Sequence, residues 1–298
     1  MFKIRVPAST ANLGPGFDCF GLALSLYIEL TAKPSSRWEL ELQGEGAERL
    51  PSDETNLIVR VAQTTAASCN IALPPMQLLI NNSIPPARGL GSSAAAITAG
   101  IALVEAARQK EFSLQEFFKH ARKFEPHVDN LSAARLGGFT VCCINDSYKV
   151  FVARHEWPTT IKAVVAIPEY ELNTKRSRSV LANRYSRSDA VFNLQHAALL
   201  QSGILTNRPD LISVAMKDRL HQPYRAELVP GLTEALELRL PGLIATALSG
   251  SGPTVVAFIT ENELAISSSL KELFASKGIV SQTQTLSIDT EGRKIDEI

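Results

Sequence analysis

The chain has 298 residues, of which 45% are hydrophobic and 20% are charged. This composition is typical of a soluble globular protein, and the length favours two domains because single cores seldom grow much beyond about 250 residues. The 30 basic side chains balance the 30 acidic ones, so no net charge draws the chain to nucleic acid or to an anionic membrane. We therefore expect small-molecule partners, with no nucleic acid and no membrane among them.

The cysteines and the first residues indicate the compartment. Four cysteines occur, without a Cys-x-x-Cys spacing and without a matching histidine pair: Cys19, Cys69, Cys142 and Cys143. This pattern argues against zinc and favours reduced thiols. The first residues lack a signal-peptide core, and no apolar run approaches the ~18 residues of a transmembrane helix. We therefore predict a cytoplasmic protein.

The first third of the chain predicts a sheet with helices. Hydrophobic periodicity indicates strands at residues 2–6, 26–32, 38–43 and 76–80, and helices at 57–68 and 94–107. The first strand should end at Pro7, and a loop of small residues should follow as far as Asp18. Strict alternation in residues 38–43 places the apolar side chains on one face. We expect an antiparallel sheet with one solvated face.

The next segment combines a helix with a dense polar cluster. Ser113 and Glu116 form a capping box, and the helix that they begin should stop at Pro126. That stop leaves Glu125 at a helix end, followed at once by three polar residues: His127, Asp129 and Asn130. Taken alone, the cluster is as consistent with bracing a turn as with a site. A hairpin over 139–144 and 148–153 follows.

The pattern breaks at residues 154–160, and we place the domain boundary there, giving domains at 1–156 and 157–298. The second half predicts strands at 162–168, 243–248, 254–259 and 280–288, and helices near 178–201, 207–219, 230–240 and 262–276. Without the extra helices, the order β-α-β-β-α-β is that of the ferredoxin-like split βαβ sandwich. The basic residues between 175 and 187 are mostly a solvated helix face, although one or two arginines could hold a carboxylate.

Residues 85–96 form the most informative stretch, Pro-Pro-Ala-Arg-Gly-Leu-Gly-Ser-Ser-Ala-Ala-Ala, between a strand and a helix. Its glycines permit a close backbone approach, and the helix start offers unpaired N–H groups, which suits an anion such as phosphate. A Walker lysine is absent after Gly91. Gly-x-Gly alone is equally consistent with a plain turn. The prolines and Ser92-Ser93 favour a site, because the serines supply a helix cap and hydroxyls for a metal or phosphate.

Two more segments join this loop in a family resemblance. Residues 6–18 (Val-Pro-Ala-Ser-Thr-Ala-Asn-Leu-Gly-Pro-Gly-Phe-Asp), residues 85–95 and residues 248–254 (Leu-Ser-Gly-Ser-Gly-Pro-Thr) resemble, in order, the three motifs of the GHMP small-molecule kinases. That family includes galactokinase, homoserine kinase, mevalonate kinase and phosphomevalonate kinase. The resemblance spans residues 3 to about 260, and residues 189–193 and 221–225 look specifically like the homoserine kinase branch.

The resemblance implies an α+β, two-domain small-molecule kinase fold. Its N-terminal ATP-binding part would be a β/α domain like domain 2 of ribosomal protein S5, and its C-terminal part would be ferredoxin-like with a helical insertion. The implied reaction is in-line transfer of the ATP γ-phosphoryl group to the side-chain hydroxyl of L-homoserine, in threonine biosynthesis, with Mg²⁺ and without a dedicated strong base. The sequence leaves both a monomer and a homodimer open.

The resemblance also assigns roles to individual residues. The ATP-binding set would be Asn56, near adenine, with Pro86, Ala87, Arg88, Gly89, Leu90, Gly91, Ser92 and Ser93 around the phosphates. Mg²⁺ would be bound by Ser93 and Glu125. The catalytic set would be Asn12, Glu125, Thr174 and Arg178. The residues around homoserine would be Asn12, Asp18, His127, Asp129, Asn130, Arg178, Arg225 and Gly250.

Two alternatives stay open: a kinase of the same family acting on mevalonate or another small alcohol, and a non-catalytic relative that binds a nucleotide. The chain departs from the homoserine kinase pattern, Glu-Gly-His-Pro-Asp-Asn, at Pro126 and Val128. Because proline fixes φ and removes an N–H donor, we expect a change in the loop beside Glu125.

Overall fold

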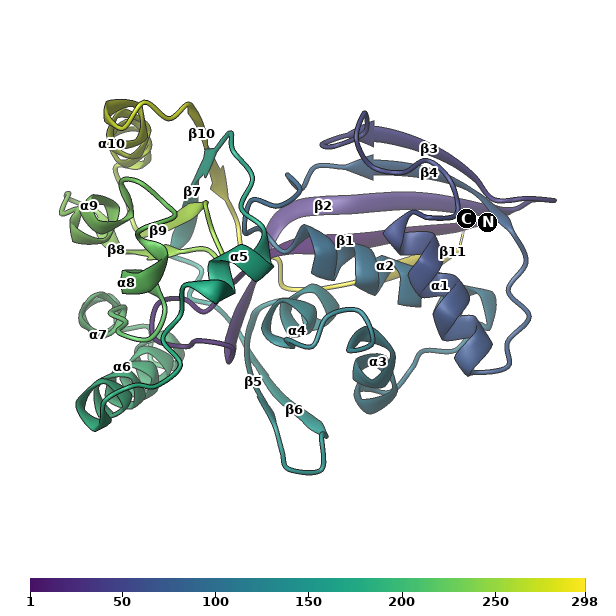
Figure 1. The fold of residues 1–298 in the computed structure, drawn as a ribbon, viewed down its shortest axis with the longest axis horizontal. Coiled ribbons are helices and arrows are strands. Elements are labelled where there is room, and N and C mark those ends of the chain that lie inside the picture. Colours follow the sequence, from purple (N-terminus) through teal and green to yellow (C-terminus); the bar gives the residue numbers. More distant parts are fainter. Residues whose placement is uncertain (298) are drawn as a thin grey trace.

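The strands form two sheets (Figure 1), in a computed structural model that describes residues 1–297. The first sheet has the order β11-β1-β2-β4-β3, and β5 and β6 continue from β2. Its strands are β1 Phe2–Ala11, β2 Phe20–Pro34, β3 Glu39–Gly44, β4 Met76–Asn82, β5 Phe139–Ile144, β6 Val150–His155 and β11 Lys294–Glu297. The predicted strands of this half are therefore present, and β1 and β2 are longer than predicted.

Two features of the first sheet correct the prediction. β1 continues through Pro7 to Ala11, because the register of β1 against β2 shifts between Pro7 and Ala8, where a missing N–H is tolerated. β3 runs parallel to β4, so the sheet is mixed rather than antiparallel. The connection from β3 to β4 passes through helix α1, and a crossover of this length is what parallel neighbours require.

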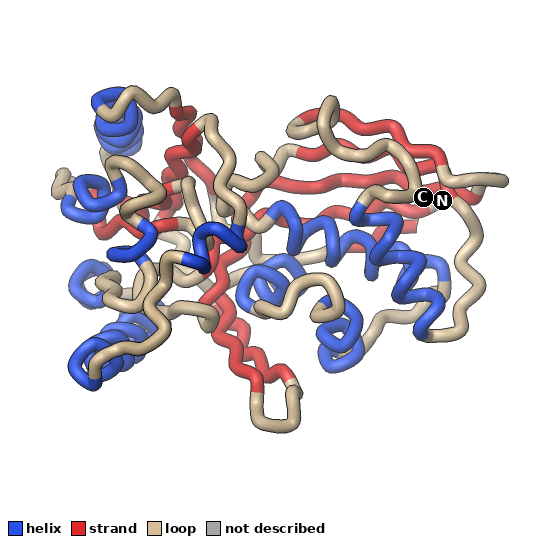
Figure 2. The backbone as a smooth tube through the Cα atoms, in the orientation of Figure 1, coloured by secondary structure: helices blue, strands red, loops and turns tan. Residues whose placement is uncertain are grey.

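Four helices cover one side of the first sheet (Figure 2): α1 Leu57–Ser68, α2 Ser92–Ala107, α3 Leu114–Ala121 and α4 Asp129–Leu136. The capping box of α3 is present as predicted. The helix nevertheless ends at Ala121 rather than at Pro126, so Glu125 lies in the following loop. Helix α4 was not predicted, and it places the polar residues Asp129 and Asn130 in its first turn.

The second sheet has the order β10-β7-β9-β8, with antiparallel neighbours throughout. Its strands are β7 Lys162–Pro168, β8 Leu243–Leu248, β9 Val255–Ile259 and β10 Ser281–Leu286, and the helices of this half are α5 Thr174–Ser179, α6 Arg187–Leu205, α7 Pro209–Ala215, α8 Gln222–Arg225, α9 Leu232–Glu237 and α10 Glu263–Ser276. This order confirms the ferredoxin-like prediction. The helix predicted near 178–201 is two helices, because Ser186 caps a new start by accepting from the N–H of Asp189.

The two sheets share a hydrophobic core. Trp157 lies between Phe139 of β5 and Phe258 of β9, with ring centroids 6.2 and 5.0 Å away. The last strand, β11, pairs with β1 after the second sheet is complete. The division of domains at residue 156 stays a prediction. The four cysteines are free, and no helix within residues 1–297 has the length and apolarity needed to cross a membrane.

Candidate active site

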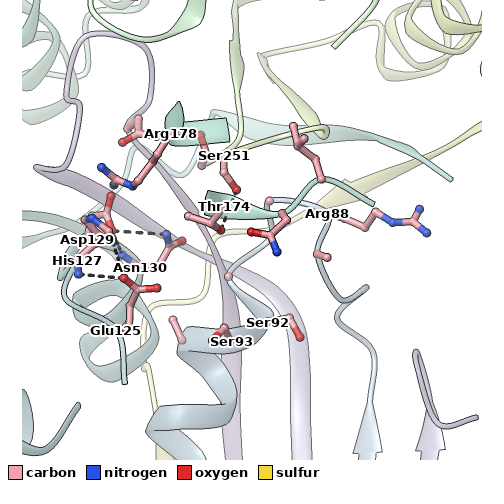
Figure 3. Close-up of a pocket in the computed structure, with 18 of the residues that line it drawn as sticks. Arg88, Ser92, Ser93, Glu125, His127, Asp129, Asn130, Thr174, Arg178 and Ser251 are labelled. Carbon is pink, nitrogen blue, oxygen red and sulfur yellow. Dashed lines mark hydrogen bonds and ion pairs between the residues drawn. The ribbon is translucent and has the colours of Figure 1, made fainter. Parts of the chain in front are cut away.

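A cleft of about 570 Å³ opens beside the glycine loop (Figure 3). It brings together most of the predicted site residues: Asn12, Asp18, Ala87, Arg88, Gly89, Gly91, Ser92, Ser93, Glu125, His127, Asp129, Asn130, Thr174, Arg178, Arg225 and Gly250. Asn56 and Pro86 line a neighbouring, mostly apolar pocket of about 300 Å³, which shares Ala87, Ser92 and Ser93 with the cleft. Leu90 lines neither, because its side chain is buried in the core.

The glycine loop is fixed by neighbours that leave no room for a side chain. Gly89 has φ +81°, and a Cβ there would lie 2.3 Å from the carbonyl oxygen of Ser249. Gly91 has φ +69°, and a Cβ there would lie 2.1 Å from Oγ of Ser9. The Ser249 hydroxyl donates to the carbonyl of Gly89 at 2.7 Å. The turn at 249–252 and the first strand therefore hold the loop in one conformation.

The N-terminus of α2 faces the cleft without a side-chain cap. Its N-cap is Gly91, which has a left-handed conformation, and Ser92 and Ser93 are the first two helical residues. The prediction that a serine caps the helix is therefore wrong, because neither serine occupies the N-cap position. Uncapped N–H groups at the start of a 16-residue helix attract an anion, and the helix dipole adds to that attraction.

Arg88 points away from the acidic residues of the cleft (Figure 3). Its Nη1 donates to the carbonyl of Pro168 at the end of β7. Its own carbonyl accepts from the N–H of Thr254 at 3.2 Å. The side chain predicted to contact ATP is thus engaged with the second sheet, and it links the glycine loop to that sheet.

Glu125 is held in the cleft by His127. One oxygen of the Glu125 carboxylate lies 2.5 Å from Nδ1 of His127 and accepts the backbone N–H of His127 at 3.0 Å. Burial alone would raise the pKa of Glu125, but the hydrogen bonds and charge of His127 outweigh it and lower the pKa below its usual value. Glu125 is therefore an anion in the same cleft as the hydroxyl of Ser93, and both are hard oxygen ligands of the kind that Mg²⁺ prefers.

Two aspartates and an arginine meet at the other end of the cleft. Arg178 binds Asp18 through both terminal nitrogens, at 2.5 and 3.1 Å. Asp129 is 3% exposed. Burial raises the pKa of Asp129 to about 6, and the nearby charge of Asp18 acts in the same direction. This end therefore holds both signs of charge within one pocket.

Arg225 lies beneath this end and is almost completely buried, at 1% exposed. Its Nη1 donates to the carbonyl of Gly250 at 2.9 Å, and Asn12 donates to the same carbonyl through Nδ2 at 2.9 Å. Burial, followed by the charge of Arg178, lowers the pKa of Arg225 to about 10, so the guanidinium stays charged at neutral pH. Asn12 also accepts the N–H of Asp18 at 3.0 Å, so its amide links the loop between β1 and β2 to the turn at Gly250.

Six residues in or near the cleft were not predicted as site residues. Phe17 lies 5.4 Å from the guanidinium carbons of both Arg178 and Arg225, measured to its ring centroid. The others line the cleft itself: Ala94, Glu171, Leu172, Asn173 and Ser251. Phe17 and Ser251 belong to the first and third motifs, so their position could have been noticed. Glu171 and Asn173 lie in a loop without any pattern in the sequence.

Thr174 begins helix α5 and carries its hydroxyl at the cleft wall (Figure 3). Its Oγ1 lies 3.4 Å from Oγ of Ser251. Ser177, one turn later, donates to the carbonyl of Ser251 at 2.8 Å. These contacts join α5 to the turn that also supports the glycine loop.

Comparison with known proteins agrees with this geometry. The GHMP kinase N-terminal domain family matches residues 56–138, and the GHMP kinase C-terminal family matches residues 197–275. The chain belongs to the GHMP kinases, a family of phosphotransferases that use ATP. The predicted two-domain kinase fold is thereby confirmed.

Its full-length relatives narrow the class further. A homoserine kinase from Aquifex aeolicus (strain VF5) is 42% identical over 297 residues, which cover 99% of each chain. The crystal structure of homoserine kinase from Cytophaga hutchinsonii has a TM-score of 0.85 at 26% identity, covering 99% of this chain and 97% of that one. A putative homoserine kinase from Listeria monocytogenes has a TM-score of 0.78 at 32% identity, with both chains fully covered.

Proposed function

We propose that this protein transfers the γ-phosphoryl group of ATP to the side-chain hydroxyl of L-homoserine and forms O-phospho-L-homoserine. The observation that carries the proposal is one cleft in which an uncapped helix end adjoins a pocket with two arginines and two aspartates. A free amino acid carries a carboxylate and an ammonium group, so its binding site requires both signs of charge. The full-length likeness to homoserine kinases points to the same acceptor.

The phosphates of ATP would lie against the glycine loop and the first turn of α2. The adenine would occupy the neighbouring apolar pocket. Asn56 contributes there indirectly, because its Oδ1 accepts the N–H of Ile58 at 3.0 Å and its Nδ2 donates to Pro51 at 2.7 Å. Its role would be to hold the pocket wall rather than to donate to the base.

The acceptor would lie between the loop that joins β1 to β2, which carries Asp18, and the second sheet. Arg178 and Arg225 would face its carboxylate, and Asp18 and Asp129 would face its ammonium group. His127 and Asn130 line the same wall. Thr174 would then stand near the reacting hydroxyl. In-line transfer needs this alignment more than it needs a strong base, and we assign no residue as a base.

A divalent cation fits the donors that the cleft presents. Ser93 and Glu125 would hold Mg²⁺, which neutralises negative charge on the transferring phosphoryl group when bound. Within residues 1–297 no cluster of three or more acidic, histidine or cysteine side chains is arranged to hold a metal. Two protein oxygens suit Mg²⁺, since that ion usually completes its shell with phosphates and water.

A coupled assay of ADP release with ATP and Mg²⁺ tests the proposal across three acceptors. Turnover that depends on L-homoserine, with little on mevalonate or L-threonine, supports it. Turnover on mevalonate would transfer the function to another branch of the family. Binding of ATP without turnover on any acceptor would identify a non-catalytic relative.

A further inference from the structure

His221 lies behind the acceptor end of the cleft, completely buried, directly before helix α8. Its Nε2 is 2.8 Å from the carbonyl oxygen of Gly14, and its Nδ1 is 3.2 Å from Nη1 of Arg225. A carbonyl only accepts and an arginine only donates, so the proton positions are fixed. Nε2–H donates to Gly14, and Nδ1 accepts from Arg225.

Phe17 and Asp218 hold the imidazole ring of His221 from two further sides. Phe17 stacks on it, with ring centroids 5.1 Å apart and an angle of 21° between the planes. Asp218 has its carboxylate 3.6 Å from Nε2, and it accepts the backbone N–H groups of His221 at 2.9 Å and Gln222 at 2.6 Å. Burial lowers the pKa of His221 to about 4. The ring is therefore neutral at physiological pH and has one orientation.

The fixed ring of His221 restricts the guanidinium of Arg225, as the hydrogen bonds of Arg225 show. Its Nε donates to Ser177 at 3.3 Å, and its Nη1 is shared between Gly250 and His221. Among residues 1–297 the side-chain hydrogen bonds of Arg225 are made by Nε and Nη1 and none by Nη2. Arg225 also lines the cleft. Because Nε and Nη1 are engaged, Nη2 is the nitrogen that can donate to a ligand. A carboxylate is the ligand that matches the geometry of a guanidinium.

We propose that His221 is a positioning residue for the amino-acid acceptor. Its Nδ1 holds Nη1 of Arg225 so that Nη2 is presented to the acceptor carboxylate. Its Nε2 ties the loop that carries Asn12 and Asp18 to the start of helix α8. One ring thereby sets the distance between the two walls of the acceptor pocket. The inference rests on the proposed function, because the ligand of Arg225 is taken to be the carboxylate of homoserine.

Two substitutions of similar polarity separate the two hydrogen bonds. In His221→Asn, the amide lies at the level of Nδ1 and can still accept from Arg225. In His221→Gln, the amide reaches the level of Nε2, so the bond to Gly14 is kept and the acceptor for Arg225 is lost. We expect the KM for L-homoserine to rise about 20-fold in His221→Gln and about threefold in His221→Asn. The KM for ATP should change less than about twofold in both.

A double-mutant cycle tests whether the effect passes through Arg225. In an Arg225→Lys background the contact with Nδ1 is already lost, so His221→Gln should raise the KM for homoserine by less than about twofold further. A purely structural role would add its full effect in that background. His196→Gln is the matched control, because His196 lies on α6 outside the cleft and its Nδ1 is 2.8 Å from the carbonyl oxygen of Phe192, one turn earlier in the same helix.

The results that overturn the inference are specific. They are a larger effect of Asn than of Gln, an equal rise in the KM for ATP, or full additivity with Arg225→Lys. Wild-type turnover on homoserine is measured first, and its absence counts against the proposed function alone. In that case nitrogen-15 spectra of the histidine rings decide, since a protonated or Nδ1–H form of His221 at pH 7 contradicts the inference directly.

Discussion

The phosphate end and the acceptor end of the cleft differ in construction. The phosphate end comes from one continuous segment, and its shape depends on the backbone at Gly89 and Gly91 packed against the 249–252 turn and strand β1. The acceptor end comes from four separate segments, and its character depends on charged side chains such as Asp18 and Arg178. Backbone changes should therefore damage the first end, whereas changes of charge should damage the second.

Gly89→Ala should have the largest effect. The new Cβ would meet the carbonyl of Ser249 at 2.3 Å in a backbone conformation that favours glycine. The loop must shift, so its N–H groups no longer point at the phosphates. We expect kcat to fall about 1000-fold, as when preorganised donors are lost, together with a higher KM for ATP. Steady-state kinetics would measure both.

Gly278→Ala is the matched control for this change. Gly278 has a similar φ of +73°, but a Cβ there meets nothing within 4 Å. It should cost about 1 kcal/mol of stability from the backbone strain and leave kcat within about twofold. Equal losses of activity in the two variants would contradict the view that neighbour contacts define the phosphate end.

Glu125→Gln should come next, because it keeps the size of the side chain and removes its charge. We expect kcat to fall about 100-fold, and the Mg²⁺ concentration for half-maximal rate to rise. Titration of the rate with Mg²⁺ at saturating ATP measures this. Unchanged turnover with unchanged Mg²⁺ dependence would remove Glu125 from the metal site. Glu116→Gln on the exposed start of α3 serves as the control.

Arg178→Ala should weaken binding of the acceptor and leave binding of ATP unchanged. It removes the guanidinium beside Asp18, so the KM for L-homoserine should rise about 30-fold while the KM for ATP stays within about twofold. Arg176→Ala lies on the same helix with an exposed side chain and should change neither value. A rise in the KM for ATP alone would assign Arg178 to the phosphate end instead.

Asp129→Asn should give the smallest effect on activity, about a tenfold rise in the KM for homoserine, together with a gain in stability. The folded state raises the pKa of Asp129 from 3.8 to about 6, so folding favours the protonated form. That stabilisation is fully present below about pH 4 and is lost as the pH rises through about 6. An asparagine never ionises, so at pH 7 the variant should be more stable by up to about 3 kcal/mol.

Urea unfolding at pH 4, 5, 6 and 7 checks this prediction. The difference between the Asp129→Asn variant and the wild type should vanish near pH 4 and grow towards pH 7. Asp146→Asn, in the exposed tip of the β5–β6 hairpin, should show no such trend. A variant that is less stable than wild type at pH 7 would mean that the Asp129 charge is satisfied in the folded state.

The phosphate end could be predicted from the sequence because its signals are local. Gly89, Gly91 and the following alanines lie within one short stretch, and their pattern specifies a loop and a helix start. The ferredoxin-like order of the second sheet followed from periodicity in the same way. The N-cap was mistaken because cap propensity favours serine, whereas the packing of Gly91 against Ser9 decides the backbone.

The acceptor end could not be assembled from the residues alone. Asp18 and Arg178 are 160 positions apart, and only the fold brings them together. The family resemblance named these residues, but it did not indicate that Arg88 turns towards β7 or that Phe17 lies against both arginines. The parallel pairing of β3 with β4 was not predicted. Alternation of apolar and polar residues shows which face of a strand is buried, but it does not show which strand pairs with it or in which direction.

The pairing of β11 with β1 has a consequence for synthesis. Phe2 faces Glu297 in this ladder, so one edge of the first sheet stays open until nearly the whole of this sequence has been made. A nascent chain must keep that edge from pairing with other strands while the second sheet forms. The same pairing of β11 with β1 places the two ends of the chain side by side (Figure 1). Joining the two ends and opening the chain at another point would therefore keep the contacts of the folded protein. It would change only which edge of the sheet is completed last during synthesis.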